Sequence, residues 1–231
     1  MARAGLGYEA VVSESSKHCV AKFIDTGSAE TQRLYLGRRT VLEMLKDRGY
    51  AVDDSDIHIS LAQFRSRFGQ VPSQDLLDRL RFSVPRISTP SEKVLVVFGG
   101  TDEIRKQAMS TLLFQLSHDS SRPKILLILQ GKMNSHARKL ADESSFQIET
   151  FPITDLLVNI TKHQLLPKHE ILSNEEQQSL LKKLEVQPSQ MPRMLETDPI
   201  VKYYGLKKGQ ILKVTYAGPS TGPFATYRCV M

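Results

Sequence analysis

The segment that ends in Lys132 is where the sequence would place magnesium-dependent cleavage of nucleic acid. Gln130, Gly131 and Lys132 follow an apolar run, and a nuclease would need an acid, one intervening residue and a lysine at that point. Gln130 is an amide rather than a carboxylate, and the neighbouring apolar run, residues 94–98, contains no acid. A magnesium ion would lack the negative charge that binds it, so a working nuclease is not predicted.

Two other segments contain part of a functional site. Residues 98–101, Phe-Gly-Gly-Thr, lie between an apolar run and a helical pattern, where backbone amides could hold a phosphate. They lack the fingerprints of dinucleotide and nucleoside triphosphate sites, so a tight strand-to-helix turn is preferred. His163 and His169 flank Pro167, but a metal site needs three or four ligands and no suitable partner lies near in the sequence. Structural hydrogen bonding is therefore the favoured role of both histidines.

The basic side chains after the second apolar run could contact phosphate without catalysing a reaction. Lys132, His136, Arg138 and Lys139 fall on a loop and the start of a helix, from which they would project toward phosphate oxygens. An ordinary solvated helix surface is the alternative. No nucleophile stands in a motif such as G-x-S-x-G with a plausible partner histidine. We therefore expect a chain that performs no chemistry of its own.

Composition is typical of a globular protein, with 231 residues, 40% of them hydrophobic and 24% charged. The formal net charge of +6 favours polyanionic neighbours, but 31 basic residues are interleaved with 25 acidic ones, so a plain surface remains an equal alternative. No apolar run could span a bilayer and residues 1–9 do not resemble a secretory signal, so an intracellular protein is expected. Cys19 and Cys229 are too few and too distant for a disulfide framework or a zinc site.

Two helices are predicted near the start of the chain. Ser28 is a suitable cap for a helix with apolar residues at helical spacing, and Gly49 supplies its end. Ser60 with Gln63 three residues later forms a capping box for a second helix. Residues 70–92, with their prolines and serines, are expected to be a connector.

Strands and helices then alternate up to residue 151. Apolar runs at 94–98 and 124–130 and an alternating run at 146–151 predict three strands. Helices are predicted at 135–143 and at 101–116, the latter with one apolar stripe made of Ile104, Ala108, Leu112 and Leu116. Buried strands separated by amphipathic helices predict an α/β sheet covered by helices.

The last eighty residues or so predict a small α+β module. A capping box at Ser173 begins a helix that runs to Leu184, and Asp198 followed by Pro199 begins a short helix that Gly205 ends. Two β-prone runs joined by a longer loop predict a hairpin, with strands at residues 211–216 and 225–230 and the loop at 218–223.

These patterns divide the chain into three predicted parts. Residues 1–28 mix Gly, Ser and Lys without periodicity and are expected to form a flexible N-terminal extension. The α/β domain is placed at residues 29–152 and the α+β module at 153–231. A module of this size has a limited core, which a large partner surface could supplement.

Several segments of the rear module, in fixed order, resemble the assembly domain of the fifth subunit of eukaryotic DNA-directed RNA polymerases, which is itself similar to a small archaeal polymerase subunit. The matching residues are 157–163, 166–169, 191–194, 198–210 and 226–228. The front part resembles the jaw domain of the same family more loosely, in Leu-Lys-Asp-Arg-Gly-Tyr at 45–50, in the two apolar strands and in Gln130-Gly131. The resemblance covers residues from about Arg33 to Met231.

The resemblance implies a non-catalytic subunit of a nuclear polymerase. The jaw domain would have a nuclease-like architecture without an active site and would flank downstream double-stranded DNA, and the assembly domain would dock on the largest subunit. The catalytic magnesium would lie in the large subunits, so no cofactor, membrane or small-molecule substrate is expected for this chain. The DNA-proximal candidates are Lys132, Asn134, Arg138 and Lys139. The docking candidates are His163, His169, Pro192, Arg193, Tyr203, Tyr204 and Arg228.

Two details refine these expectations. The family carries a Thr-Pro pair near DNA where this chain has Met133 and Asn134, which puts the detail of that contact in doubt. Pro192 and Arg193 are expected in an irregular connector, where the arginine would either fork to a partner or brace its own chain.

The leader, the divergent jaw and the ending Arg-Cys-Val-Met at 228–231 look most like plant variants of the silencing polymerases IV and V, which act in RNA-directed DNA methylation. The alternative within the family is the ordinary subunit shared by polymerases I, II and III. The alternatives from other classes are a free nucleic-acid-binding module, which would bind DNA without a protein partner, and a relict nuclease, which would cleave with magnesium.

Overall fold

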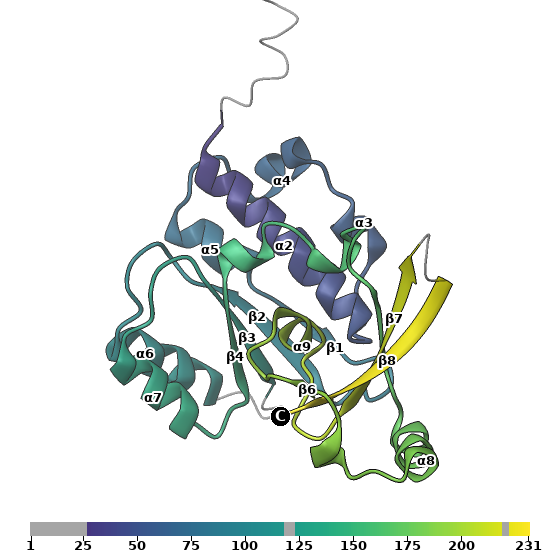
Figure 1. Cartoon of the computed structure of the whole chain (residues 1–231). Coiled ribbons are helices and arrows are strands. Elements are labelled where there is room, and N and C mark those ends of the chain that lie inside the picture. The colour runs from purple at the N-terminus through teal and green to yellow at the C-terminus, as the bar shows by residue number, and fades with distance from the viewer. Residues whose placement is uncertain (1–26, 118–122, 219–221) are drawn as a thin grey trace, which may run out of the picture.

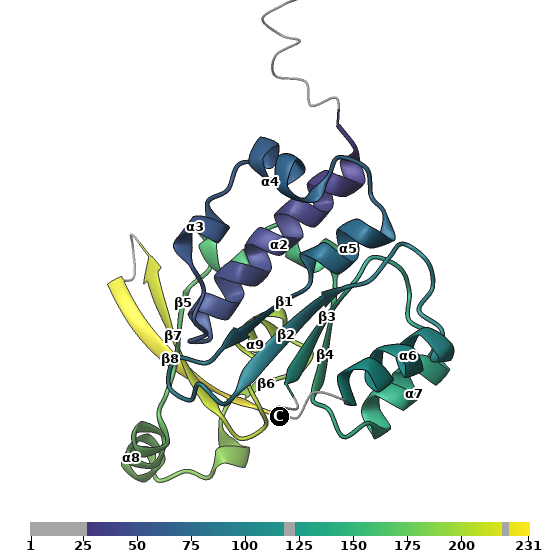
Figure 2. The ribbon, with the colours of Figure 1, turned by 180° about the vertical axis from the view of Figure 1, so that it is seen from behind.

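The computed structural model describes residues 27–117, 123–218 and 222–231, and Figures 1 and 2 show them from opposite sides. They contain two four-stranded sheets, each with helices packed against it. The predicted mixed α/β organisation is therefore confirmed. Most of the predicted extension, residues 1–26, and Cys19 within it lie outside the described residues.

The helix predicted after Ser28 is α2, Ala29–Asp47. The Ser28 hydroxyl accepts a hydrogen bond from the Thr31 amide at 3.5 Å. The chain leaves the helix through Gly49, whose φ of +82° is a backbone conformation that glycine adopts without steric cost. Both ends of α2 are thus set by local sequence, as predicted.

Three short helices and a strand follow, namely α3 (Asp54–Ile57), α4 (Leu61–Phe68), α5 (Gln74–Leu80) and β1 (Phe82–Pro85). The capping box predicted at Ser60 and Gln63 is present at the start of α4. The prediction that residues 70–92 form a connector was wrong, since α5 and β1 lie in this segment. Each is too short for a clear period, and α5 is held by packing of its buried Leu76, Leu77 and Leu80 on the sheet.

The first sheet has the order β1-β2-β3-β4. Strands β2 (Lys93–Phe98), β3 (Lys124–Leu129) and β4 (Ile148–Pro152) run parallel, and β1 pairs antiparallel to β2. Helix α6 (Lys106–Ser117) lies between β2 and β3 in the chain, and α7 (Ser135–Glu143) lies between β3 and β4. This is the helix-covered α/β sheet that the alternating pattern predicts.

The helix predicted at 101–116 begins five residues later than expected. Ile104 is not on the helix, because its amide donates to the Lys132 carbonyl at 2.9 Å and its carbonyl accepts from the Asn134 amide at 3.0 Å. Ala108 is exposed and Met109 is buried in its place, whereas Leu112 and Leu116 of the predicted stripe pack on the sheet as expected. Residues 98–101 therefore do not form a tight strand-to-helix turn, and a longer loop pinned to a neighbouring loop takes its place.

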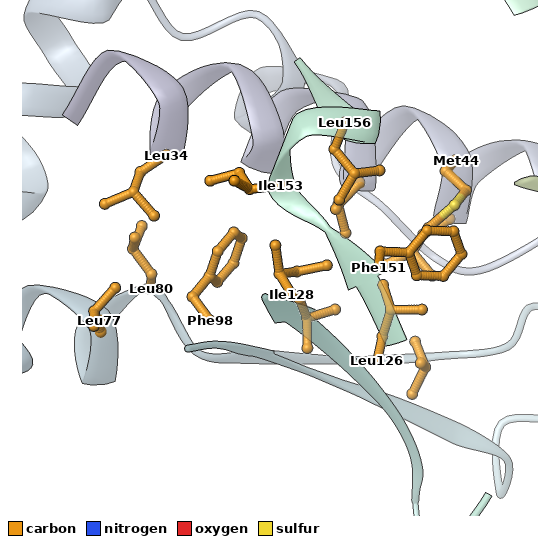
Figure 3. Close-up of a cluster of buried hydrophobic side chains, with 14 of the residues drawn as sticks. Leu34, Met44, Leu77, Leu80, Phe98, Leu126, Ile128, Phe151, Ile153 and Leu156 are labelled. Atoms are coloured by element: carbon orange, nitrogen blue, oxygen red, sulfur yellow. The ribbon is translucent and has the colours of Figure 1, made fainter. Parts of the chain in front are cut away.

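The largest buried cluster lies between α2, α4 and α5 and one face of the first sheet (Figure 3). Phe98, Leu126, Ile128 and Phe151 point from the sheet toward Leu34 and Met44 of α2. The opposite face of the sheet is covered by α6 and α7 through Leu127, Met109 and Ala137, among others. Both faces of the parallel strands are thus buried, which explains why they read as continuous apolar runs.

Three 3-10 turns, η1 (Ile153–Leu156), η2 (Ile160–Lys162) and η3 (Pro188–Gln190), connect the elements of the rear part. Ile153 and Leu156, which follow the predicted boundary at Pro152, belong to the same buried cluster as α2. Figure 3 shows both side chains lying between η1 and α2. The rear part of the chain therefore begins inside the core of the front part.

The second sheet has the order β5-β7-β8-β6. The predicted hairpin is β7 (Ile211–Gly218) and β8 (Gly222–Val230), and its pairing continues to Gly218 opposite Gly222, so both strands are longer than predicted. Strands β5 (Lys168–Ile171) and β6 (Arg193–Met194) were not predicted, because four and two residues are too short for a sequence period.

Two helices, both as predicted, cover opposite faces of this sheet. Helix α8 (Asn174–Leu184) begins with the capping box of Ser173 and packs over Ile211 and Cys229. Helix α9 (Pro199–Tyr204) ends at Gly205 and packs over Leu212 and Val230. Among the described residues, no helix has the length and apolar character needed to cross a membrane.

Candidate nucleic-acid and subunit interfaces

The loops that follow β2 and β3 are fastened to each other at one end of the first sheet. The Gln130 side-chain amide donates to the Gly99 carbonyl at 2.9 Å, and Ile104 forms an isolated parallel bridge with Met133. A Cβ on Gly131 would lie 2.4 Å from the Asp102 carbonyl oxygen, so only glycine fits there. A nuclease would need an acid at the position of Gln130. In this chain Gln130 and Gly131 instead form a joint that connects the loop after β3 to the loop after β2.

Replacing Gly131 by alanine is expected to destabilise this joint by about 1–3 kcal/mol, because the added methyl group meets backbone that cannot rotate away. Urea denaturation of the full chain would measure the loss. Gly100→Ala is the matched control, since its Cβ would meet only Leu77 Cδ1 at an ordinary 3.7 Å. Equal stability of the two variants would contradict the steric explanation.

Three of the four predicted DNA-proximal residues are cations that point to solvent beside this joint. The three are Lys132, Arg138 and Lys139, and all are exposed. Within the described ranges, 27–117, 123–218 and 222–231, none of them forms an ion pair. His136 is exposed on the first turn of α7. The loop after β3 and the start of α7 thus bring the predicted basic side chains to one end of the sheet.

Asn134 has a structural function in this cluster. It is the N-cap of α7, where its side-chain oxygen accepts a hydrogen bond from the His136 amide at 3.1 Å. Its neighbour Met133 is half-buried against the apolar cluster under α6 and α7. Asn134 therefore starts a helix, and Met133 fixes the loop before it to the core.

The two predicted docking histidines lie on different elements: His163 follows η2 and His169 lies on β5 of the second sheet. His163 is exposed, and its Nδ1 accepts a hydrogen bond from the Leu165 amide at 3.2 Å. His169 lies on β5 opposite Val214, and burial keeps its pKa below the usual histidine value despite the nearby Pro167 carbonyl. No group of three or more His, Cys, Asp or Glu side chains in the described part of the chain is arranged to hold a metal.

Pro192 lies in irregular structure as predicted, whereas Arg193 is the first residue of the two-residue strand β6, so its prediction as part of an irregular connector was wrong. The Pro192 carbonyl accepts from the Cys229 amide at 2.8 Å, and Arg193 pairs with Cys229 as the first residue of β6. Both side chains are exposed. Arg228 lies on β8 opposite Leu212 and forms no ion pair within the described ranges.

Tyr203 is placed inside the chain, unlike the other docking candidates. Its side chain is buried, and its hydroxyl donates to Asp47 Oδ2 at 2.7 Å and accepts from Asn159 Nδ2 at 3.1 Å. Burial and the Asp47 carboxylate both raise the pKa of this hydroxyl. Tyr204 is half-buried and packs edge-to-face on the Tyr203 ring at 5.2 Å. Tyr203 therefore belongs to the contact between α9 and α2 and not to an exposed docking surface.

Arg48, a residue that the sequence did not single out, joins the two parts of the chain. Its Nε donates to the Tyr203 carbonyl at 2.8 Å and its Nη2 to the Lys202 carbonyl at 2.6 Å, at the end of α9. Its Nη1 lies 2.8 Å from Glu149 Oε2 on β4. The side chain is only 5% exposed, so its charge is neutralised inside the protein. One arginine thus satisfies carbonyls at the end of a helix and pairs with the sheet.

A second polar contact lies one turn earlier on α2. Asn159 Nδ2 donates to Glu43 Oε2 at 2.8 Å, and Lys162 Nζ lies 2.5 Å from Glu43 Oε1. Burial works to raise the pKa of Glu43, but hydrogen bonds from Lys162 and Asn159 hold it below its ordinary value. The segments 45–50 and 198–210, which carried the family resemblance, meet through Asp47 and Arg48, and Asn159 of segment 157–163 joins them through Tyr203. This resemblance was the available signal for the junction.

Comparison with known proteins agrees with both halves of this structure. The family model described as RNA polymerase Rpb5, N-terminal domain, matches residues 28–116, and the model described as RNA polymerase Rpb5, C-terminal domain, matches residues 158–230.

Similar proteins over nearly the whole chain come from Arabidopsis thaliana. DNA-directed RNA polymerase V subunit 5C is 45% identical over 94% of this chain and 92% of its own length. DNA-directed RNA polymerases IV and V subunit 5B is 43% identical over 98% of this chain and 99% of its own length. A more distant relative, the RNA polymerases I, II and III subunit RPABC1 of Caenorhabditis briggsae, is 31% identical over 87% of this chain and 97% of its own length. With both domains and nearly the full length matched, the chain belongs to the Rpb5 family, the fifth subunit of DNA-directed RNA polymerases.

Proposed function

We propose that this chain is a non-catalytic subunit of a plant nuclear RNA polymerase of the IV or V type, which acts in RNA-directed DNA methylation. Its rear module docks on the largest subunit, and its jaw flanks downstream DNA. The chain binds no cofactor, and the catalytic magnesium belongs to the large subunits. Its jaw has a nuclease-like layout in which Gln130 replaces the acid that a nuclease would need.

The observation that carries this proposal is the difference in identity among the relatives. Subunits whose names assign them to polymerases IV and V are 43–45% identical to this chain, whereas a subunit shared by polymerases I, II and III is 31% identical. Both comparisons cover most of each chain, so the difference does not come from a missing domain. It favours the silencing polymerases over the shared-subunit alternative.

The exposed surfaces support the two contacts in different ways. Lys132, Arg138 and Lys139 are exposed cations without ion pairs in the described residues, as expected of groups that neutralise DNA phosphates. Arg193 on β6 is exposed and Arg228 on β8 is half-buried. Neither forms an ion pair with a described residue, so both remain available to carboxylates of a partner. Both arginines are proposed to contact the largest subunit, together with His163.

The assignment is tested by expressing a tagged chain in a plant and identifying the polymerase subunits that purify with it. Mass spectrometry is expected to find the largest subunit of polymerase IV or V. Recovery of the polymerase II largest subunit at equal or greater abundance would favour the shared-subunit alternative. A chain that purifies alone and binds DNA would favour a free nucleic-acid-binding module.

Replacing Lys132, Arg138 and Lys139 together by alanine is expected to weaken DNA binding of the assembled polymerase. If all three contact phosphate, the slope of log affinity against log salt concentration falls by roughly 0.9 for each lost contact. Filter binding at several salt concentrations measures the slope. The control is Lys182→Ala with Lys183→Ala on α8, which removes exposed charge elsewhere. An unchanged slope in the triple variant would remove these residues from the DNA contact.

The relict-nuclease alternative has a separate test. Incubation of the full chain with magnesium and linear duplex DNA is expected to give no cleavage. Cleavage that Lys132→Ala abolishes would revive the nuclease assignment, because Lys132 stands where the lysine of an acid-x-lysine pair would be needed.

A further inference from the structure

The outer edge of the first sheet carries a trench that none of the contacts above occupies. β4 is the last strand in the order β1-β2-β3-β4, so one of its edges has no neighbouring strand. A cavity of about 390 Å³ lies along this edge, between residues 148–151 and the end of α9 with the turn that follows it. A polar cavity of about 650 Å³ shares Lys124, Gln147, Gly205 and Lys207 with the first, so the two are continuous.

The backbone of β4 has unused hydrogen-bonding groups on this edge. The Ile125 amide donates to the Gln147 carbonyl at 2.8 Å, and Ile125 is paired with Ile148 in the parallel register. In a parallel pair, alternate residues use their backbone groups toward the same neighbour, so Ile148 and Thr150 turn theirs away from β3. Neither residue makes a backbone hydrogen bond on that side to any described residue. The edge therefore presents two amides and two carbonyls to the trench.

The charged groups of the trench leave an excess of cations. Each of its three acids is already paired: Glu92 with Arg86 at 3.2 Å, Glu149 with Lys124 at 2.5 Å and Glu196 with Lys208 at 3.7 Å. Lys93, Lys202 and Lys207 also line it, and they form no ion pair within the described residues.

We propose that the outer edge of β4 binds an extended acidic peptide segment of another protein. The segment pairs with Ile148 and Thr150 as an added strand and places its carboxylates against Lys202 and Lys207. This addition of a strand to an open edge supplies backbone hydrogen bonds for affinity, while the lysines select acidic sequences. The inference does not depend on which polymerase the chain joins.

A peptide fits the edge better than a nucleic acid does. A sheet edge alternates hydrogen-bond donors and acceptors, and another peptide backbone matches both, whereas a phosphate backbone offers acceptors and leaves the carbonyls of Ile148 and Thr150 without donors. Positive charge alone is therefore not the property that selects the ligand here.

The probe is a short blocked synthetic peptide of alternating threonine and glutamate, titrated into the full chain while amide signals are followed by NMR. The Ile148 and Thr150 amides are expected to shift and to exchange more slowly with solvent, because they become hydrogen-bonded. The same peptide with lysine in place of glutamate is expected to bind weakly. Absence of any shift at Ile148 and Thr150 at the highest soluble peptide concentration would overturn the proposal.

Two pairs of variants separate edge pairing from charge. Thr150→Pro removes an amide that faces away from β3, so the hydrogen bonds of the sheet remain. It is expected to weaken binding of the peptide roughly tenfold or more. Thr150→Val keeps the amide and is the matched control. The double variant Lys202→Glu, Lys207→Glu is expected to weaken peptide binding at least roughly fivefold. The control, Lys182→Glu with Lys183→Glu, makes the same charge change on α8 and is expected to leave binding unchanged.

Three results would contradict the proposal even if the probe binds. Equal affinity of the Thr150→Pro and Thr150→Val variants would exclude strand addition. Equal affinity of the two double-glutamate variants would exclude the lysines as the selecting charges. A duplex DNA that shifts the same two amides and competes with the peptide would make the trench a nucleic-acid surface instead.

Discussion

Replacing Arg48 by alanine is expected to lower the free energy of unfolding by about 3–5 kcal/mol, since Glu149 keeps only Lys124 as a partner and two carbonyls lose a buried donor. Glu149 would lose the guanidinium at 2.8 Å, and two carbonyls at the end of α9 would lose their donor. Urea denaturation at unchanged m value measures the loss. The reduced stability is also expected to lower recovery of the variant with its polymerase.

Lys46→Ala on the same helix is the matched control. Lys46 pairs with Asp54 at 2.5 Å, but both side chains are more than half exposed, so its loss is expected to cost at most about 1 kcal/mol. Arg48→Lys keeps the charge, but its donors all leave from one nitrogen and lack the planar fork by which Nε, Nη1 and Nη2 reach three separate acceptors. We therefore expect it to recover only part of the stability. Equal losses for Arg48→Ala and Lys46→Ala would contradict a special role for the buried arginine.

The same contact predicts how stability depends on pH. Burial works to raise the pKa of Glu149, but Arg48 and Lys124 hold it below the ordinary value of 4.5. A carboxyl group with a lowered folded pKa stabilises the protein fully above its unfolded pKa and loses that contribution as pH falls through the folded value. The wild-type chain is therefore expected to lose stability below about pH 4.5 more steeply than Arg48→Ala, as measured by thermal unfolding across acidic pH. Parallel pH profiles would contradict this coupling.

Replacing Leu156 by alanine is expected to destabilise the front domain by about 2–5 kcal/mol, although the residue lies after the predicted boundary. Its side chain is 3% exposed and packs in the cluster formed by α2 and the first sheet. Because the cavity would open in the shared core, unfolding followed by signals from either part of the chain is expected to shift to lower urea together.

Leu165→Ala is the control for this variant. Leu165 is 86% exposed, so its truncation removes little buried surface and is expected to change stability by less than about 0.5 kcal/mol. Separate transitions for the two parts in Leu156→Ala, with the front part unchanged, would show that the two cores are independent.

Elements with a local signal were predicted from sequence. The caps at Ser28, Ser60 and Ser173 and the Asp198-Pro199 start fixed four helices, because a side chain bonds to a backbone amide two or three residues later. The parallel strands were recognised because two helix layers bury both of their faces. The short elements α5, β5 and β6 were missed, since each is stabilised by partners distant in sequence and carries no period of its own.

The sequence by itself determined the family and the position of its basic loop, since segments in a fixed order and a strand followed by lysines and arginine are visible without coordinates. Only the tertiary structure decided which polar side chains form hydrogen bonds within the chain and are therefore not available to partners. Tyr203 and Asn134 were predicted to face partners, but Tyr203 bonds to Asp47 and Asn134 bonds to the backbone of α7. The role of Arg48 became visible only from its contact with α9. The physical reason is that a hydrogen bond satisfies a buried polar group only through a neighbour, and distant segments become neighbours only when the chain packs.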